Sequence, residues 1–207
     1  VIGTENIFKI AQKKNIKVVF ASSSSVYGNV NEIPISESSI KKPINPYGIT
    51  KLDDEKLAEK FVKKNLQVIG LRYFNVYGIG QTGSYAGVIT KFINRLKENK
   101  NLIINGDGNQ IRDFIFVDDV ARANIKAMKS NVKEGFFNIG TNIGTSINDL
   151  ANMLIEISQQ KINSIHSEQL EGDIKFSQAD TKLTKKILEW EFQTHLKQGL
   201  EKIYPNF

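Results

Sequence analysis

The chain has 207 residues, of which 40% are hydrophobic and 24% charged, so it can bury a sizeable core and is not a disordered polypeptide. It contains no cysteine, which excludes disulfides, thiol catalysis and cysteine metal sites. The net charge of +6 is concentrated in the first hundred residues, where lysines fall on the polar sides of helical patterns. A solvated surface is therefore favoured over a nucleic-acid site, and no nucleic-acid partner is expected.

Two further absences limit the function. The two histidines, His166 and His195, are far apart and have no ligand-type neighbour at metal spacing, so no metal centre is expected. No apolar run approaches the roughly 18 residues of a membrane span, and no signal peptide opens the chain. The sequence therefore predicts no membrane partner and a cytoplasmic location.

The first elements in chain order are a helix and a strand. "VIGTENIFKIAQKKN" places Ile2, Ile7, Ile10 and Ala11 on one side of a helix, with no strand before it. "IKVVFASS" is a short apolar run of the kind found in buried parallel strands. The order predicts the later part of a longer α/β fold.

The middle of the chain continues this alternation. After a turn-rich stretch with prolines 34, 43 and 46, residues 47–64 predict an amphipathic helix, and "LQVIGLRYF" predicts a buried strand. Glycines 78, 80, 83 and 87 mark a loop before a helix at 88–97, and "LIINGDG" predicts a strand that ends in a turn.

The last ninety residues predict smaller elements. "DFIFVDDVARANIKAMKS" indicates a brief strand and a helix capped by Asp118 or Asp119, "GFFNIG" a strand, and "SINDLANMLIEIS" a helix capped by Ser146. A weaker strand near 162–166 and helices at 181–188 and 194–203 follow. The alternation favours an α/β fold with a parallel sheet and a smaller mixed lobe after about residue 75.

Tyr47 and Lys51 are the first candidates for chemistry. In "NPYGITKLDDEKL" they are four residues apart, so they share one face of the predicted helix. An ammonium close to a phenol favours the phenolate, which can act as a base. By chance such a pair is common in helices, so the spacing alone is a weak signal.

A run of hydroxyls supports the same site. Ser22 to Ser25 follow the strand "VVFASS", and open α/β sheets place ligands at the carboxyl ends of their strands. Ser23 lies 24 residues before Tyr47, which is a short enough gap for the chain to return to the same cleft. A polar exit from a strand is the simpler interpretation of the serines taken alone.

Four segments together resemble a known family. Ser-Ser-x-x-Val-Tyr-Gly, Asn-Pro-Tyr-Gly-x-x-Lys, "LRYFNVYG" and "INGDGNQIRDFIFVDDVARA" occur in the order found in extended short-chain dehydrogenase/reductases that act on nucleotide sugars. The chain most resembles the UDP-glucose (UDP-galactose) 4-epimerases, from "VIGTEN" to "EGDIKFSQAD". The resemblance implies a partial Rossmann-type parallel sheet with helices on both faces and a smaller mixed α/β substrate lobe. Residues 1–75 would belong to the NAD-binding domain and 76–207 mainly to the lobe, with about 114–145 returning to the Rossmann domain.

The resemblance also implies a reaction and its catalytic residues. In the family a tyrosine phenolate takes the proton from the sugar 4-hydroxyl while hydride passes to NAD, the 4-keto sugar turns over, and hydride returns to its other face. Carried over, the base is Tyr47, Lys51 also holds the nicotinamide ribose, and Phe74 lies against the nicotinamide. Ser23 hydrogen-bonds the reacting oxygen, with Ser24 as its neighbour.

The resemblance further implies a substrate site. It assigns Arg112 to the diphosphate, although an ion pair of this arginine with Asp113 is the alternative interpretation. Further residues implied in binding the nucleotide sugar are Asn75, Val88, Ile103, Asn105 and Ser177. Leu170 stands where the family usually has a second arginine, so Lys175 or another cation would substitute there, or phosphate binding would be weaker.

Other interpretations stay open. Related dehydratases carry acidic residues where this chain has Ser24 and Ser25, which favours an epimerase over a dehydratase. A dehydratase or reductase of the same family remains the alternative enzyme. A non-catalytic nucleotide-sugar-binding protein would need Arg112 but not the Tyr47 and Lys51 pair. "GIGQTG" is a literal G-x-G-x-x-G that has Asp107 downstream, and it offers an alternative dinucleotide site.

The resemblance gives two last expectations. The family's glycine-rich loop lies in roughly its first hundred residues, which have no counterpart in this chain, so the 207 residues alone should not hold NAD firmly. The intact parent would be the enzyme. A homodimer is expected through the helices at 2–14 and 47–64, as the family pairs them.

Overall fold

The fold is built around a three-stranded parallel sheet. The computed structural model describes residues 1–81, 87–170 and 172–207. Strands β1 (Val18–Ser23), β2 (Val68–Tyr73) and β7 (Glu134–Ile139) pair in parallel in the order β1-β2-β7. All three are apolar runs, and Ile69, Leu71 and Ile139 are fully buried. The predicted α/β class with a parallel sheet is confirmed.

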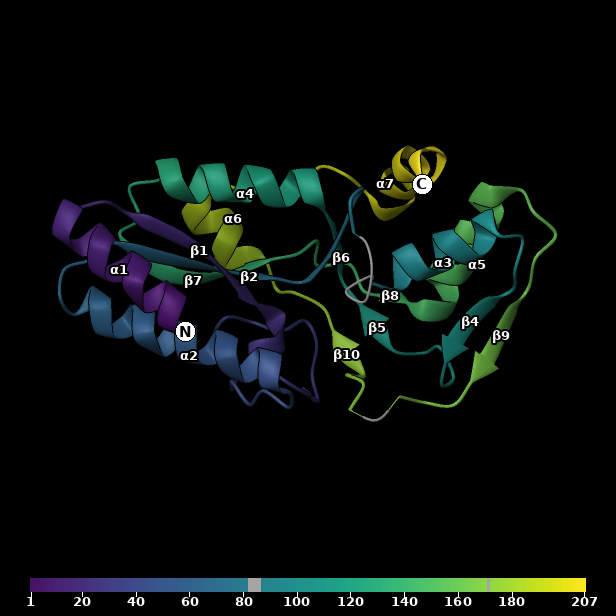
Figure 1. The fold of residues 1–207 in the computed structure, drawn as a ribbon, viewed down its shortest axis with the longest axis horizontal. Coiled ribbons are helices and arrows are strands. Elements are labelled where there is room, and N and C mark those ends of the chain that lie inside the picture. Colours follow the sequence, from purple (N-terminus) through teal and green to yellow (C-terminus); the bar gives the residue numbers. More distant parts are fainter. Residues whose placement is uncertain (82–86, 171) are drawn as a thin grey trace.

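Helices cover both faces of this sheet (Figure 1). On one face lie α1 (Ile2–Lys14) and α2 (Pro46–Val62), and on the other lie α4 (Val117–Lys129) and α6 (Lys182–Leu188). The start of α2 is well defined because Asn45 accepts a hydrogen bond from the Gly48 N–H at 2.8 Å and Pro46 occupies the first turn. The position of Tyr47, in the first turn of α2, is therefore fixed by this helix start.

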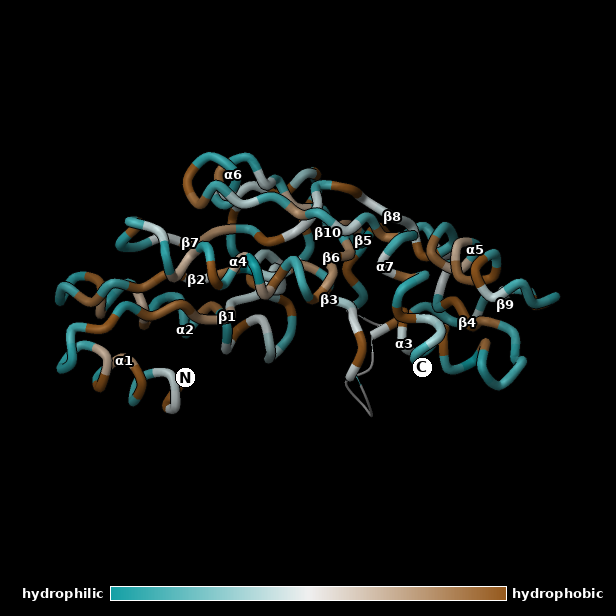
Figure 2. The backbone as a smooth tube through the Cα atoms, turned by 90° about the horizontal axis from the view of Figure 1, so that it is seen from above, coloured by the Kyte–Doolittle hydropathy of each residue, from teal (hydrophilic) through white to brown (hydrophobic). Residues whose placement is uncertain are grey.

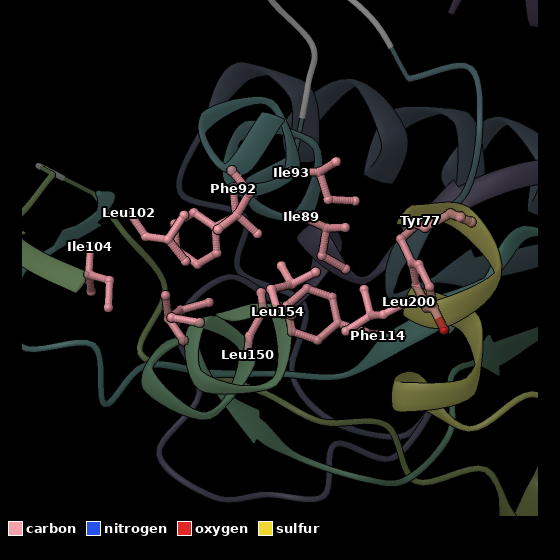
Figure 3. Packing of buried hydrophobic residues seen from close by; sticks show 14 of the residues in the cluster. Tyr77, Ile89, Phe92, Ile93, Leu102, Ile104, Phe114, Leu150, Leu154 and Leu200 are labelled. Carbon is pink, nitrogen blue, oxygen red and sulfur yellow. The ribbon is translucent and has the colours of Figure 1, made fainter. Parts of the chain in front are cut away.

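The other half of the chain has its own core. Its elements are α3 (Val88–Lys97), β4 (Leu102–Asn105), α5 (Ile147–Ser158), β9 (Ser164–Ser167) and α7 (Leu196–Ile203), followed by the short turn η3 (Tyr204–Asn206). Figure 3 shows this core, with Phe92 near Leu102 on one side, Tyr77 near Leu200 on the other, and Leu150 and Leu154 between them. A second hydrophobic cluster therefore supports this half of the chain, with a core separate from that of the three-stranded sheet.

Short strands connect the two halves. β3 (Asn75–Tyr77) pairs with β6 (Phe114–Phe116), and β5 (Ile111–Arg112) lies between β10 (Phe176–Ser177) and β8 (Thr145–Ser146). Figure 2, seen from above, shows these strands between the half that holds β1, β2 and β7 and the half that holds α3 and α5. β7 and α6 both follow residue 114 yet pack with the first sheet. The domain boundary near residue 75 stays a prediction.

One of the two predicted helix caps is wrong. Ser146 caps α5 by accepting a hydrogen bond from Asp149 N at 3.0 Å, as expected. Neither Asp118 nor Asp119 caps α4, whose N-cap position is Phe116. The Asp119 side chain is buried and accepts hydrogen bonds from the backbone N–H groups of Gln193 and Thr194. Its carboxylate therefore holds a distant segment instead of the helix end.

Among the residues that the structure describes, no helix has the length and apolar character that crossing a membrane requires.

Candidate active site

The serines predicted for the site lie at the carboxyl end of β1. β1 ends at Ser23, and a single turn, η1 (Ser24–Val26), follows it. Ser23 Oγ accepts a hydrogen bond from Ser25 N at 3.1 Å and donates one to Ser25 Oγ, also at 3.1 Å. A Cβ on Gly48 would lie 2.5 Å from Ser25 O, so the first turn of α2 touches this turn directly. The turn that carries the serines therefore packs directly against the start of α2.

Tyr47 and Lys51 lie one turn apart on α2 beside this strand end. Lys51 Nζ lies 5.7 Å from the centre of the Tyr47 ring and donates a hydrogen bond to Ala21 O of β1 at 2.9 Å. The Tyr47 side chain is 54% exposed, which is unusual for an aromatic residue at a fixed helix start. The structure thus brings an accessible phenol and an ammonium together at the end of the strand.

A buried charge network lies one helical turn further along α2. The Glu55 carboxylate accepts two hydrogen bonds of 2.8 Å from Arg72 Nε and Nη2, and a third of 2.6 Å from Ser22 Oγ. Arg72 also donates to Tyr27 Oη at 2.8 Å, and burial raises the pKa of Tyr27 to about 12. The sequence reasoning missed Glu55, although its spacing of four from Lys51 repeats that of Tyr47 and Lys51.

Arg112 has a different partner from the one considered from the sequence. Its Nη2 pairs with Asp173 Oδ1 at 2.6 Å, and its Nη1 donates to Ile111 O at 2.8 Å. Burial lowers the pKa of Arg112, and the Asp173 carboxylate opposes this effect. The alternative pairing with Asp113 is wrong, because the Asp113 carboxylate is bound by four other donors.

A cavity of about 300 Å³ lies beside this ion pair. Its lining residues are Asn105, Gly106, Asp107, Asn109, Gln110, Gln169, Asp173, Ile174, Lys175 and Phe176. Asn105 Oδ1 accepts a hydrogen bond from Ser167 Oγ, and Gln110 Nε2 donates to Asn105 O. Ile103 shares the face of β4 that carries Asn105, since the buried Leu102 and Ile104 alternate with them. Asp173 is the residue here that the sequence reasoning gave no role.

The remaining predicted residues occupy different environments. Asn75 starts β3, and its N–H donates to Asp113 O at 2.9 Å. Phe74 is buried in a cluster with Val26 and Ala179, and Val88 packs on the hydrophobic core that contains Phe92 and Leu150. Their contacts with a ligand stay predictions.

The residues around the family's diphosphate and sugar positions also differ in exposure. Ser177 is 6% exposed and pairs with Arg112 across β10 and β5. Leu170 is exposed, and Lys175 lines the cavity. The substitution of Lys175 or another cation for the missing second arginine stays a prediction, as does weaker phosphate binding.

The structure does not describe the whole of the alternative glycine motif. Gly83 of "GIGQTG" lies outside the described residues, and Asp107 lies in a turn on the cavity wall. The described part of the chain holds no group of three or more histidine, aspartate or glutamate side chains suited to a metal ion.

The residues present fit the reactive end of a dinucleotide. An exposed phenol and an ammonium lie on one helical face at the carboxyl end of a parallel strand, which is where open α/β sheets bind such ligands. No other cofactor chemistry is needed to explain this pair.

Comparison with known proteins gives the family. Residues 1–140 match the model of the NAD dependent epimerase/dehydratase family. A Methanocaldococcus jannaschii protein provisionally named UDP-glucose 4-epimerase is 37% identical over 98% of this chain and 67% of its own length. The chain spans about two thirds of the length of such relatives.

Solved structures agree with this match. The UDP-glucose 4-epimerase of Thermotoga maritima with UDP-glucose has a TM-score of 0.94 and 36% identity, over 99% of this chain and 68% of that one. The UDP-N-acetylglucosamine 4-epimerase of Methanobrevibacter ruminantium with UDP-N-acetylmuramic acid has a TM-score of 0.95 and 31% identity, over 99% and 67%. The sequence motifs, the parallel sheet and these matches lead to one conclusion: the chain belongs to the NAD dependent epimerase/dehydratase family.

Proposed function

We propose that the complete protein that contains this chain is an NAD-dependent nucleotide-sugar 4-epimerase. The observation that carries the proposal is the Tyr47 and Lys51 pair, which the 2.9 Å bond from Lys51 to Ala21 O anchors to the strand end that holds Ser23. The similarity to structures of UDP-sugar 4-epimerases supports the same assignment. The substrate would be UDP-glucose/UDP-galactose or the N-acetylated pair.

Each residue has a definite role in this proposal. Tyr47 removes the proton from the sugar 4-hydroxyl and returns it after the 4-keto sugar has turned over. Lys51 places its positive charge 5.7 Å from the centre of the Tyr47 ring and binds the nicotinamide ribose. Ser23 orients the reacting oxygen by a hydrogen bond, with Ser24 beside it. NAD, when bound, accepts the hydride from the sugar carbon and supplies it again.

The substrate half would hold the nucleotide. Arg112 pairs with the diphosphate, for which the guanidinium geometry is well suited. Asn75, Val88, Ile103 and Asn105 contact the nucleotide or the sugar. The cavity of about 300 Å³ beside Arg112 is too small for a whole UDP-sugar by itself, so it would take one part of the ligand.

The test measures conversion of UDP-glucose to UDP-galactose by ¹H NMR, using the complete gene product and NAD. Tyr47→Phe should lower kcat at least about a hundredfold, because it removes the general base. Lys51→Met should act similarly. The matched controls, Tyr204→Phe at the C-terminal turn and Lys56→Met on the outer surface of α2, should stay within about twofold.

The alternatives give distinct results in the same assay. A dehydratase would form a 4-keto-6-deoxy sugar, and a reductase would consume reduced cofactor in proportion to product. A non-catalytic protein would bind UDP-sugar without turnover. A Tyr47→Phe variant with the same kcat as the wild type would contradict the proposed mechanism.

Ser177 would set the sugar specificity. The small side chain at this position leaves room for an N-acetyl group, so we propose that UDP-GlcNAc and UDP-GalNAc are also substrates. Ser177→Tyr should lower turnover of the acetylated sugars relative to the plain ones, whereas Ser177→Ala should not. If Ser177→Tyr leaves the ratio of acetylated to plain sugar turnover unchanged, this hypothesis is wrong.

The expected homodimer would use α1 and α2, which lie side by side (Figure 1). Ile7 and Ile10 of α1 are 58% and 53% exposed, and Ile49 of α2 is exposed as well. Replacing Ile7 and Ile10 with lysine should yield a monomer in light scattering, whereas Ile165→Lys on β9 should not. A wild-type monomer at micromolar concentration would contradict this proposal.

A further inference from the structure

Asp113 is a buried acid that the proposed mechanism does not use. Its side chain is 0% exposed. Oδ1 accepts hydrogen bonds from Thr141 N and Thr141 Oγ1, both at 2.7 Å, and Oδ2 accepts from Asn142 N at 3.0 Å and Ala179 N at 3.1 Å. Four donors that converge on two oxygens suit an ionised carboxylate, which has acceptor sites only.

This carboxylate is held by neutral groups. Within residues 1–81, 87–170 and 172–207, no lysine, arginine or histidine forms an ion pair with Asp113. Burial raises the pKa of Asp113, and the four hydrogen bonds oppose this effect. Burial of a charge without a nearby cation costs folding free energy, which indicates that Asp113 has a role beyond packing.

The surroundings of Asp113 include three predicted substrate contacts. Arg112 precedes it in β5, and Asn75 N donates to its backbone carbonyl at 2.9 Å. Ala179, which donates to its carboxylate, lies two residues after Ser177. Arg112 and Ser177 are register partners across β5 and β10. One residue therefore joins the segments that carry Asn75, Arg112 and Ser177.

The local strands need such a connection. β5, β8 and β10 contain two residues each, so their ladders supply few hydrogen bonds to fix the direction of the chain. Asp113 follows directly after Arg112, the last residue of β5, so holding the Asp113 carboxylate in place also limits where the end of β5 can lie. Gly140 permits the close approach, because a Cβ there would lie 2.8 Å from Asp113 Oδ2.

From these contacts we infer that Asp113 is a positioning residue for nucleotide binding, which aims the Arg112 guanidinium at the diphosphate by tying β5 to residues 141–142 and 179. The inference rests on the proposed function, in which Arg112 binds the diphosphate. It predicts that Asp113 affects ligands with a diphosphate and spares ligands without one.

The experiment is a double-mutant cycle on the complete gene product, with UDP and uridine binding measured by calorimetry. Asp113→Asn should weaken UDP binding roughly tenfold and change uridine binding less than about twofold. In the Arg112→Ala background, Asp113→Asn should cause no further loss of UDP affinity, because the residue it positions is absent. Asp53→Asn, which makes the same change at an exposed aspartate of α2, is the matched control and should retain UDP affinity.

Circular dichroism is measured for each variant. If Asp113→Asn fails to fold, Gly140→Ala replaces it. The added Cβ would lie 2.7 Å from Ala179 Cβ and 2.8 Å from Asp113 Oδ2, so it disturbs the same contact between the carboxylate and residue 179 without changing the charge. Equal losses for UDP and uridine, or losses that are the same with and without Arg112, overturn the inference and indicate a general structural role. So does a folded Asp113→Asn variant with wild-type UDP affinity.

The two proposals fail in different ways. A wild-type chain that does not bind UDP at millimolar concentration overturns both the proposed nucleotide site and the inference. UDP binding that requires Arg112 but is insensitive to Asp113 and Gly140 overturns the inference alone.

Discussion

Glu55 on α2 and Asp113 between β5 and β6 are both buried carboxylates, but they are stabilised differently. Glu55 receives two hydrogen bonds from Arg72 and one from Ser22. Asp113 receives three from backbone N–H groups and one from a hydroxyl. The first region balances a charge with a charge, and the second disperses a charge over dipoles. The stability of the Glu55 region should therefore depend on the Arg72 cation, and that of the Asp113 region on the backbone conformation that presents the N–H groups.

The largest expected effect comes from breaking the ion pair. Glu55→Gln leaves the Arg72 guanidinium buried without a counter-charge, which should lower the free energy of unfolding by about 3–5 kcal/mol. Urea unfolding monitored by circular dichroism measures this change. The double variant Glu55→Leu/Arg72→Met removes both charges and should recover most of the loss. If the double variant is as unstable as the single one, charge balance is not what stabilises this region.

The same network should respond to alkaline pH through Tyr27. Its folded-state pKa is raised to about 12 by burial, above an ordinary value near 10. Between pH 10 and 12 the unfolded chain loses the phenol proton while the folded chain keeps it. The contribution of Tyr27 to the free energy of unfolding is therefore fully present below pH 10. It should fall by about 3 kcal/mol as the pH rises through 12.

Tyr27→Phe isolates this contribution from the other groups that titrate there. The variant is less stable at pH 9 because two hydrogen bonds are lost, and the difference from wild type should shrink at pH 11.5. Urea unfolding at both pH values measures the difference. A gap that stays constant with pH would show that Tyr27 titrates alike in both states.

Asp113→Asn tests the other region. The asparagine amide presents a donor where Asn142 N and Ala179 N need an acceptor, so the free energy of unfolding should fall by about 2–3 kcal/mol. No cation is left unpaired in this case, so the loss should be smaller than in Glu55→Gln. A larger loss would mean that backbone dipoles support a buried charge better than Arg72 does.

The smallest effects come from one hydroxyl in each region. Ser22→Ala removes one of three donors to Glu55, and Thr141→Val removes one of four donors to Asp113. Because Glu55 keeps its arginine, Ser22→Ala should cost about 0.5–1 kcal/mol, against about 1–2 kcal/mol for Thr141→Val. Thermal unfolding of the two variants measures the order. The reverse order would contradict the distinction between the two regions.

The sequence predicted the parts of the fold that carry a long periodic signal. The strands around "VVFASS" and "LQVIGLRYF" and the helix at 88–97 lie where the patterns placed them. The two-residue strands β5, β8 and β10 could not be found, because two residues carry no period. Those strands exist because of tertiary contacts.

The site shows the same limit. The shared helical face of Tyr47 and Lys51 follows from their spacing alone. The partner of Arg112 is Asp173, 61 residues away, and no local pattern links the two. Adjacency in the sequence suggests Asp113 as the partner, but its carboxylate is already bound by Thr141, Asn142 and Ala179.

The contact between Gly48 and Ser25 O has an evolutionary consequence. Any side chain at position 48 must push the helix that carries Tyr47 away from the serine turn, so the active site tolerates only the smallest residue there. A saturation library selected for activity should return glycine at this position and many residues at the exposed Thr50.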